Sequence, residues 1–316
     1  MKNTEFGPYL DTLDGLVRKA CAHLQGNLDE EQIELYDLAF VQAEILAART
    51  LIEQAHLVPE LDAPCRYFCA NAIVSITQKL SVRPQTFGLT AKDLPTLEPL
   101  QDCLSPQAIA ALGQSYLEHG LASDLLDDEK RIIRDTFKDF ADAVVKPLAE
   151  DVHRQDLLVP AEILEPLKEM GVFGLSVPER FGGLKPDTTE DSMGMVIVTE
   201  ELSRGSLGAA GSLITRPEIM ARAVLEGGTE EQQARWLPQI ASGQTLCAVS
   251  VTEPNTGSDV ASVALKATKS DGGWLLNGGK TWCTYAGAAG ALLVLARTDA
   301  DATPAHKGLS LFVVEK

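Results

Sequence analysis

The chain has 316 residues, 45% of them hydrophobic, which allows two or three domains with a sizeable core. Lys and Arg number 27 and Asp and Glu 45, so the net charge of −18 argues against attraction to nucleic acid or to an anionic membrane. No apolar run approaches the roughly 18 residues of a membrane span, and the N-terminal segment resembles neither a secretion signal nor a transit peptide. We therefore expect a cytoplasmic protein without nucleic-acid or membrane partners.

The cysteines give a second indication of the compartment. Six are spread through the chain, and only Cys65 and Cys69 are close to each other. A spacing of four residues places both on one face of a helix. No histidine or second cysteine pair accompanies them at zinc spacing. We expect buried free thiols and no metal site, which fits a reducing cytoplasm.

Residues 1–122 are predicted to form a helical N-terminal extension. A long amphipathic helix is expected from Leu28 to Leu57, because apolar residues recur at helical spacing before Pro59 closes it. A second helix is expected from Ala63 to Leu80, and a short one from Ser105 to Gly120. The apolar positions of the long helix are Ile33, Leu35, Leu38, Ala39, Val41, Ile45, Leu46 and Leu51.

Residues 123–244 are predicted to form a second helical domain. Asp127 or Asp128 is a suitable N-cap for its first helix, which Pro147 disrupts late. A turn-rich segment with aromatic residues follows at 171–183. The other helices are expected over Pro160–Met170, Asp191–Ser203, Gly205–Ile219 and Glu230–Ile240.

Residues 245–316 change from helical to strand periodicity and are predicted to form an antiparallel β-domain. Glycine, aspartate, asparagine and proline separate the strands, and Asp271-Gly272-Gly273 is typical of a hairpin turn. Because the chain stops directly after a strand, we expect this domain to be incomplete. The fold class is therefore α+β. The strands are expected over Thr245–Val251, Ala264–Thr268, Trp274–Gly278, Ala291–Arg297 and Leu309–Val314.

The polar stretch after the first strand is the best candidate site. Val251 and Thr252 lead from the strand into a turn that ends with Gly257 and Ser258. A turn of this kind exposes backbone N–H groups and hydroxyls together, which suits a phosphate or pyrophosphate. Taken alone, it is more typical of an ordinary polar turn between strands.

Together with four other strings, this stretch resembles the acyl-CoA dehydrogenase family. The resemblance covers residues 126–316, and the strings occur in the family's order. They are Gly171-Val172-Phe173-Gly174-Leu175, Thr199-Glu200-Glu201-Leu202-Ser203-Arg204, Gly228-Thr229-Glu230-Glu231, Ser250-Val251-Thr252-Glu253-Pro254 with Gly257-Ser258-Asp259, and Asn277-Gly278-Gly279-Lys280-Thr281-Trp282-Cys283-Thr284. The family's fold of a helical domain followed by a β-domain agrees with the order of elements expected here.

The resemblance implies that these strings bind FAD. Thr252 would offer its hydroxyl and backbone groups to the pyrimidine edge of the flavin ring, and Val251 is expected to contact the cofactor beside it. Gly257 would allow close backbone approach, and Ser258 would donate to the pyrophosphate. Trp282 would supply a flat apolar surface, and Thr284 a hydrogen bond near flavin N5. By itself, Trp282 would fit equally well as an aromatic residue packed on a strand.

The resemblance also implies a reaction and its partners. The family removes an α proton from an acyl-CoA with a carboxylate while the β hydrogen leaves as hydride, and electrons pass to an electron-transfer flavoprotein. The family's base lies in a C-terminal helical bundle, so it is expected beyond Lys316 and no catalytic residue is assigned here; Glu253 and Asp259 match no catalytic position. A homodimer or tetramer is expected by analogy. The alternatives are a flavin oxidase or monooxygenase of the same fold, and a non-catalytic binding or assembly protein.

Two further features indicate a branch of the family. The helical extension is similar to that of the members which oxidise a branched dicarboxylic thioester, such as (2S)-methylsuccinyl-CoA to mesaconyl-CoA in the ethylmalonyl-CoA pathway. By the resemblance, Thr215 and Arg216 occupy the segment that lines the far end of the acyl pocket in the family, and Ser258 is expected to contact substrate as well. The planar guanidinium of Arg216 suits a distal carboxylate. The alternative is an Arg216 at a helix end or an interface that pairs with Glu218 or with another acid nearby.

Overall fold

A computed structural model describes residues 2–24, 30–120, 126–189 and 191–316. The chain separates into two compact units, Met1–Leu125 and Leu126–Lys316. The boundary predicted at residue 122 lies outside the described residues. The predicted division between residues 244 and 245 falls inside the second unit and stays a prediction.

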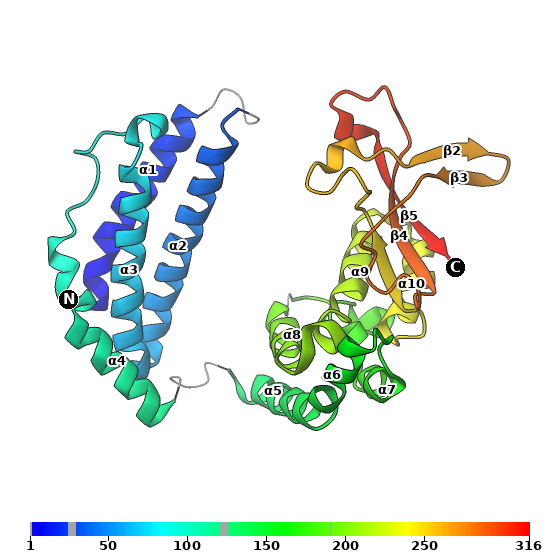
Figure 1. Cartoon of the computed structure of the whole chain (residues 1–316), viewed down its shortest axis with the longest axis horizontal. Helices are drawn as coiled ribbons and strands as arrows, with labels where there is room; N and C mark the ends of the chain where they lie inside the picture. The colour runs from blue at the N-terminus through cyan, green and yellow to red at the C-terminus, as the bar shows by residue number, and fades with distance from the viewer. Residues whose placement is uncertain (1, 25–29, 121–125, 190) are drawn as a thin grey trace. The chain divides into compact units, whose positions relative to one another are not determined.

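The first unit is helical, as expected (Figure 1). Its helices are α1 (Gly7–His23), α2 (Gln32–Leu57), α3 (Asp62–Ser81) and α4 (Pro106–His119). Helix α2 ends before Pro59 as predicted, whereas the expected start at Leu28 lies outside the described residues. Helix α1 was not singled out in advance. Ser105 caps α4, because its side chain accepts a hydrogen bond from the backbone N–H of Ala108.

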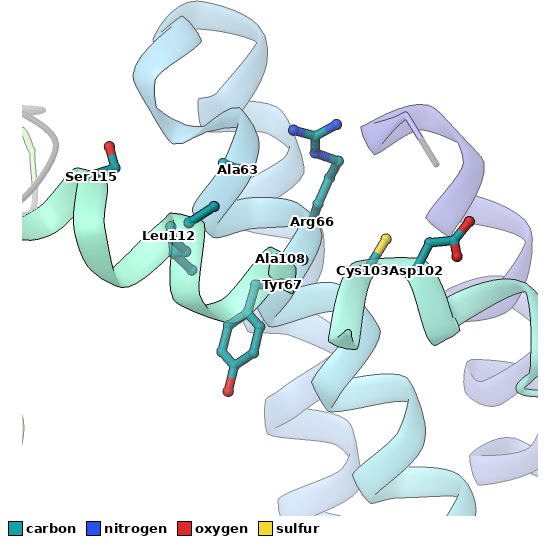
Figure 2. A pocket seen from close by; sticks show the side chains of 9 residues that line it. Ala63, Arg66, Tyr67, Asp102, Cys103, Ala108, Leu112 and Ser115 are labelled. Atoms are coloured by element: carbon teal, nitrogen blue, oxygen red, sulfur yellow. The ribbon is translucent and has the colours of Figure 1, made fainter. Parts of the chain in front are cut away.

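Helix α4 packs less tightly on α3 than the other helices pack on one another. None of its residues is fully buried. A cavity of about 350 Å³ lies where α3, the turn before α4 and α4 meet (Figure 2). It is lined by Ala63, Arg66, Tyr67, Asp102, Cys103, Ala108, Ala111, Leu112 and Ser115. It contains no residue of the predicted site.

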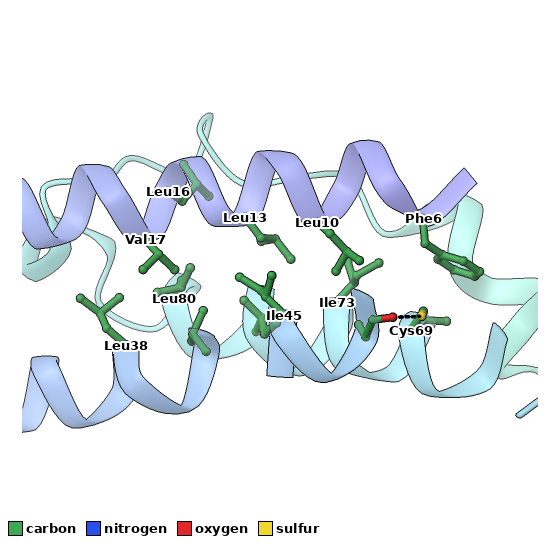
Figure 3. Packing of buried hydrophobic residues seen from close by; sticks show 14 of the residues in the cluster. Phe6, Leu10, Leu13, Leu16, Val17, Leu38, Ile45, Cys69, Ile73 and Leu80 are labelled. Atoms are coloured by element: carbon green, nitrogen blue, oxygen red, sulfur yellow. Dashed lines mark hydrogen bonds between the residues drawn. The ribbon is translucent and has the colours of Figure 1, made fainter. Parts of the chain in front are cut away.

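The core of the first unit lies between α1, α2 and α3 (Figure 3). Leu10 and Leu13 of α1, Ile45 of α2 and Ile73 of α3 are fully buried there. Three positions of the predicted apolar stripe on α2 are not part of this core, since Ala39 is exposed, Ile33 is 64% exposed and Leu46 is 55% exposed. The stripe is wider than the face that the two neighbouring helices cover.

The prediction of buried free thiols is confirmed for Cys65 and Cys69, whereas Cys21 is exposed. All six are free, and Cys65 and Cys69 are fully buried on one face of α3 with their sulfur atoms 3.9 Å apart. Among the described residues, no group of histidines, cysteines and carboxylates is arranged to hold a metal ion. None of the described helices is both long enough and apolar enough to cross a membrane.

The second unit begins with helices. They are α5 (Asp128–Phe140), α6 (Lys146–Arg154), α7 (Ala161–Glu169), α8 (Ser192–Ser206), α9 (Thr215–Gly227) and α10 (Glu230–Ala241). Asp127 caps α5 as predicted, by accepting from the backbone N–H of Lys130 at 2.8 Å. A π-helical turn at Ala141–Val145 joins α5 to α6 directly before Pro147. The wider turn accommodates the proline, which has no N–H to donate.

The single helix predicted over Gly205–Ile219 is wrong. Helix α8 continues to Ser206, a π-helical turn follows at Leu207–Gly211, and α9 starts only at Thr215. Gly211 packs closely on α8, since a Cβ there would lie 2.2 Å from Ser203 Oγ. This break places Thr215 and Arg216 in the first turn of α9.

The sheet of the second unit is mixed, not antiparallel as predicted. Its strands are β1 (Cys247–Ser250), β2 (Lys266–Ser270), β3 (Gly273–Asn277), β4 (Ala291–Arg297) and β5 (Leu309–Glu315). β4 pairs with β1 in parallel and with β5 antiparallel, and β2 pairs with β3 antiparallel and with β4 in parallel at one position. The predicted hairpin turn is confirmed, because Ser270 pairs with Gly273 and Gly272 has a φ of +88°. The α+β class is confirmed.

Helices α9 and α10 cover one face of β1 and β4 (Figure 1). Met220 and Val224 of α9 and Leu237 of α10 pack against Cys247 and Leu293 of the sheet. Because successive side chains of β4 point to opposite faces of the sheet, Val294 and Ala296 lie on the other face, where they pack against Leu265. The C-terminal end of β1 lies near the first turn of α9, because Ser250 contacts Cys283 and the neighbouring Thr284 contacts Arg216.

Gly183 holds the turn-rich segment in place, and its substitution is expected to destabilise the second unit. A Cβ at this position would lie 1.9 Å from the carbonyl oxygen of Val177. We expect Gly183→Ala to lower the free energy of unfolding by about 1–3 kcal/mol. Urea unfolding followed by tryptophan fluorescence measures it, because Trp236, Trp274 and Trp282 all belong to the second unit.

Gly227→Ala is the matched control, since a Cβ there meets nothing within 4 Å. Equal midpoints for Gly183→Ala and Gly227→Ala would contradict the close contact.

Candidate functional site

The two strings predicted to bind a cofactor lie side by side after β1. The backbone N–H of Thr281 donates to the carbonyl oxygen of Thr252 at 2.9 Å. The Ser250 hydroxyl and the Cys283 thiol are 3.0 Å apart. Two segments about thirty residues apart in sequence are thus joined at their backbones and side chains.

A buried ion pair fixes this arrangement. Lys280 Nζ lies 3.0 Å from Glu253 Oε1, and the two side chains are only 7% and 9% exposed. Lys280 also donates to the carbonyl oxygen of Val251, and Glu253 accepts from the backbone N–H groups of Ala264 and Leu265. Burial raises the pKa of Glu253, but these two N–H groups and the Lys280 ammonium outweigh burial and hold the pKa below its usual value. Glu253 therefore holds the site together as a carboxylate.

The loop after Glu253 presents hydrogen-bond donors to solvent. The backbone N–H of Glu253 donates to Thr256 and that of Thr256 donates back to Glu253, which closes the turn. Within the described part of the chain, the N–H groups of Gly257 and Ser258 and the Ser258 hydroxyl have no protein acceptor. Only the Thr252 methyl group, at 3.9 Å, would meet a Cβ on Gly257. This open, donor-rich loop fits the phosphate oxygens of a dinucleotide.

The second string carries two unusual aromatic residues. Trp282 is 86% exposed and has a left-handed backbone with a φ of +57°. Trp282 is therefore not packed on a strand, and a large apolar side chain in that conformation is a feature of ligand sites. Tyr285 also has a positive φ, of +72°. Burial raises the pKa of the Tyr285 phenol, whose oxygen has no hydrogen-bond partner among the described residues.

The predicted substrate residues join the predicted cofactor residues. Arg216 Nη1 donates to Thr215 Oγ1 at 2.9 Å, and Arg216 Nη2 donates to Thr284 Oγ1 at 3.2 Å. Arg216 lies at a helix end, as the alternative expected, but the pair with Glu218 is not formed, because Glu218 pairs with Arg222 one turn further along α9. Among the described residues, no carboxylate lies within ion-pair distance of Arg216.

A positive charge in the first turn of a helix is unfavourable unless an anion is present. Arg216 and the N-terminus of α9 therefore favour an anion beside Thr284. The guanidinium has five N–H donors, of which two are used by the neighbouring hydroxyls. Enough donors remain for a carboxylate.

A large groove elsewhere in the second unit contains none of the predicted residues. It has a volume of about 840 Å³ and lies between α9, α10 and strands β3 to β5. Trp274 and Phe312 line it in an edge-to-face contact, and Arg235 pairs with Glu315 beside it. The candidate site is an open surface formed by loops and the first turn of α9, since Gly257, Ser258, Trp282 and Thr284 are exposed.

Sequence reasoning missed three contributors to the site. The Glu253–Lys280 pair and Tyr285 were not assigned a part in it, and the contact between Arg216 and Thr284 was not foreseen. A signal for the pair was present, because both residues belong to the two strings that were singled out. Cys283, between two site residues, is partly buried, and its thiol contacts the Ser250 hydroxyl.

Family models match most of the second unit. The acyl-CoA dehydrogenase N-terminal domain matches residues 127–244, and the acyl-CoA dehydrogenase middle domain matches residues 248–316. The chain is 49% identical over 191 residues to a (2S)-methylsuccinyl-CoA dehydrogenase of Cereibacter sphaeroides, which covers 60% of this chain and 34% of that protein. It is 36% identical over 198 residues to a mitochondrial 2-methylacyl-CoA dehydrogenase of Solanum tuberosum, which covers 61% and 45%.

A solved structure of a dehydrogenase also matches this chain. A glutaryl-CoA dehydrogenase from Mycobacterium smegmatis in complex with FADH2 superposes with a TM-score of 0.53 at 28% identity, over 60% of this chain and 46% of that one. The matched part of the chain spans between a third and half of the length of these proteins.

Proposed function

Since the chain belongs to the acyl-CoA dehydrogenase family, we propose that the protein carries out the FAD-dependent α,β-dehydrogenation of an acyl-CoA thioester. The observation that carries the proposal is the contact between Arg216 and Thr284, which joins the predicted substrate residues to the predicted cofactor residues. The electrons pass to an electron-transfer flavoprotein. The active protein is a homodimer or tetramer in the cytoplasm.

The residues of the site fit FAD. Gly257 and Ser258 offer free N–H groups and a hydroxyl to the pyrophosphate, and Val251 and Thr252 lie beside them for the pyrimidine edge of the flavin. Trp282 offers an exposed aromatic face to the ring. The bound FAD supplies the acceptor for the β hydrogen that leaves the substrate as hydride. The Glu253–Lys280 pair fixes the two strings, so the donors are in place before the cofactor binds.

We propose that the substrate is a short, branched dicarboxylic acyl-CoA such as (2S)-methylsuccinyl-CoA, converted to mesaconyl-CoA. Arg216 and Thr215 bind the distal carboxylate, and Ser258 contacts the substrate near the cofactor. Thr284 is the residue expected at the reacting end of the flavin, and Arg216 contacts it directly. A carboxylate held by Arg216 is therefore close to the reacting carbons, which favours a short diacid. The name of the relative from Cereibacter sphaeroides agrees with this substrate. The base that removes the α proton is not assigned to a residue of this chain.

FAD binding tests the cofactor site. We expect the full-length protein to be purified yellow, and Trp282→Ala to weaken FAD binding about tenfold through loss of an aromatic contact worth about 1.4 kcal/mol. Quenching of FAD fluorescence on titration with the apoprotein measures the affinity.

Trp274→Ala is the matched control, because Trp274 is also partly exposed but packs on Phe312 in the groove that contains none of the predicted site residues. If both alanine variants bound FAD as the parent does, the assignment of Trp282 would fail. A colourless parent that shows no FAD binding would refute the proposed function.

A further inference from the structure

Arg216 connects two hydroxyl groups that belong to different parts of the chain. Thr215 is its neighbour in α9, whereas Thr284 is 68 residues away in the second string. Within the described residues, the guanidinium contacts no carboxylate, and the Thr284 side chain makes no other hydrogen bond. The hydrogen-bonding state of the Thr284 hydroxyl therefore depends on Arg216.

A threonine hydroxyl has one proton to donate and two lone pairs that accept. Arg216 cannot accept, so it always donates to Thr284 Oγ1 and occupies one of those lone pairs. The hydroxyl proton is thereby directed away from the guanidinium. A cationic donor on the oxygen also polarises the O–H bond and makes the hydroxyl a stronger donor to the next group.

We propose that Arg216 is a positioning residue that orients and strengthens the Thr284 hydroxyl as a hydrogen-bond donor to the flavin, and that it thereby raises the reduction potential of the bound FAD. The proposal rests on the proposed function, because it takes Thr284 as the flavin contact. Reduction adds negative charge to the cofactor, and a stronger hydrogen-bond donor beside the ring stabilises that charge. Arg216 thus links the part of the site that binds the acyl group to the part that accepts the electrons.

The reduction potential of the FAD in the full-length protein, measured by equilibration with a redox dye, tests this role without substrate. We expect Arg216→Met to lower the equilibrium constant for two-electron reduction about tenfold, which corresponds to about 30 mV. Thr284→Val should lower it by a similar factor, and the double variant by no more than the larger single effect, since both changes remove the same hydrogen bond. Arg216→Lys should restore part of the potential, because it keeps the charge and a donor.

Arg222→Met is the matched control. It removes the same charge from the same helix, but Arg222 pairs with Glu218 and not with Thr284. An unchanged potential in Arg216→Met, or a double variant whose effect equals the sum of the single effects, would overturn the inference and leave the proposed function standing. A parent that binds no FAD would overturn both. Far-UV circular dichroism and FAD content of each variant establish that the potentials refer to folded, loaded protein.

Discussion

Lys280→Met is expected to destabilise the second unit by about 3–5 kcal/mol. The substitution leaves the Glu253 carboxylate buried without its cation, although the carboxylate keeps the backbone N–H groups of Ala264 and Leu265. Because the pair fixes both strings, we expect the affinity for FAD to fall together with the stability of the second unit. Urea unfolding followed by tryptophan fluorescence measures the loss in the second unit alone, as all three tryptophans lie there.

Two comparisons separate the ion pair from a general effect of the substitution. Lys266→Met removes an exposed lysine of β2 and should change stability by less than about 0.5 kcal/mol. Glu253→Gln in the Lys280→Met background should recover part of the loss, because the neutral amide oxygen still accepts from the backbone. Equal unfolding midpoints for Lys280→Met and Lys266→Met would contradict the structural role of the pair.

The pH dependence of this effect follows from the lowered pKa of Glu253. A carboxylate with a lowered folded-state pKa contributes stability that is fully present above its unfolded pKa of about 4.3 and is lost as pH falls through the folded value. The difference in stability between parent and Lys280→Met should therefore be largest near neutral pH. It should shrink in acid, where Glu253 is protonated in both proteins. A difference that grows as pH falls would show that charge is not the cause.

Short sequence patterns were sufficient to predict most helices and turns of the fold. Helix α2 ends before Pro59, Asp127 caps α5 and Gly272 turns the hairpin, as the sequence predicts. Each of these outcomes depends on a few neighbouring residues with one strong preference. The start of α9 could have been predicted in the same way, because Pro217 is favoured in the first turn of a helix and disfavoured in its interior.

The features that could not be predicted depend on contacts between distant residues. The parallel pairing of β1 with β4 joins strands more than forty residues apart, and period-two alternation does not specify strand direction. The break between α8 and α9 depends on Gly211 packing against Ser203. The helical spacing of the apolar residues gives no indication of this contact. For the same reason the sequence identified Arg216 and Thr284 separately but not their contact.

Loss of specificity is the main expected effect of Arg216→Met on catalysis. A charge-assisted hydrogen bond to a carboxylate is worth about 1.5–3 kcal/mol, so kcat/KM for methylsuccinyl-CoA should fall about ten- to a hundredfold. Butyryl-CoA has the same chain length but no distal carboxylate, so it gains nothing from this bond. Steady-state kinetics of the full-length protein with electron-transfer flavoprotein as acceptor give both values.

The ratio of the two kcat/KM values is the decisive quantity. If Arg216 also raises the reduction potential of FAD, its loss slows both substrates by a common factor, which cancels in the ratio. What remains is the binding of the distal carboxylate. Arg222→Met should leave the ratio unchanged, because Arg222 is committed to Glu218. A ratio in Arg216→Met equal to that of the parent would mean that the carboxylate is bound elsewhere, whatever the effect on the flavin.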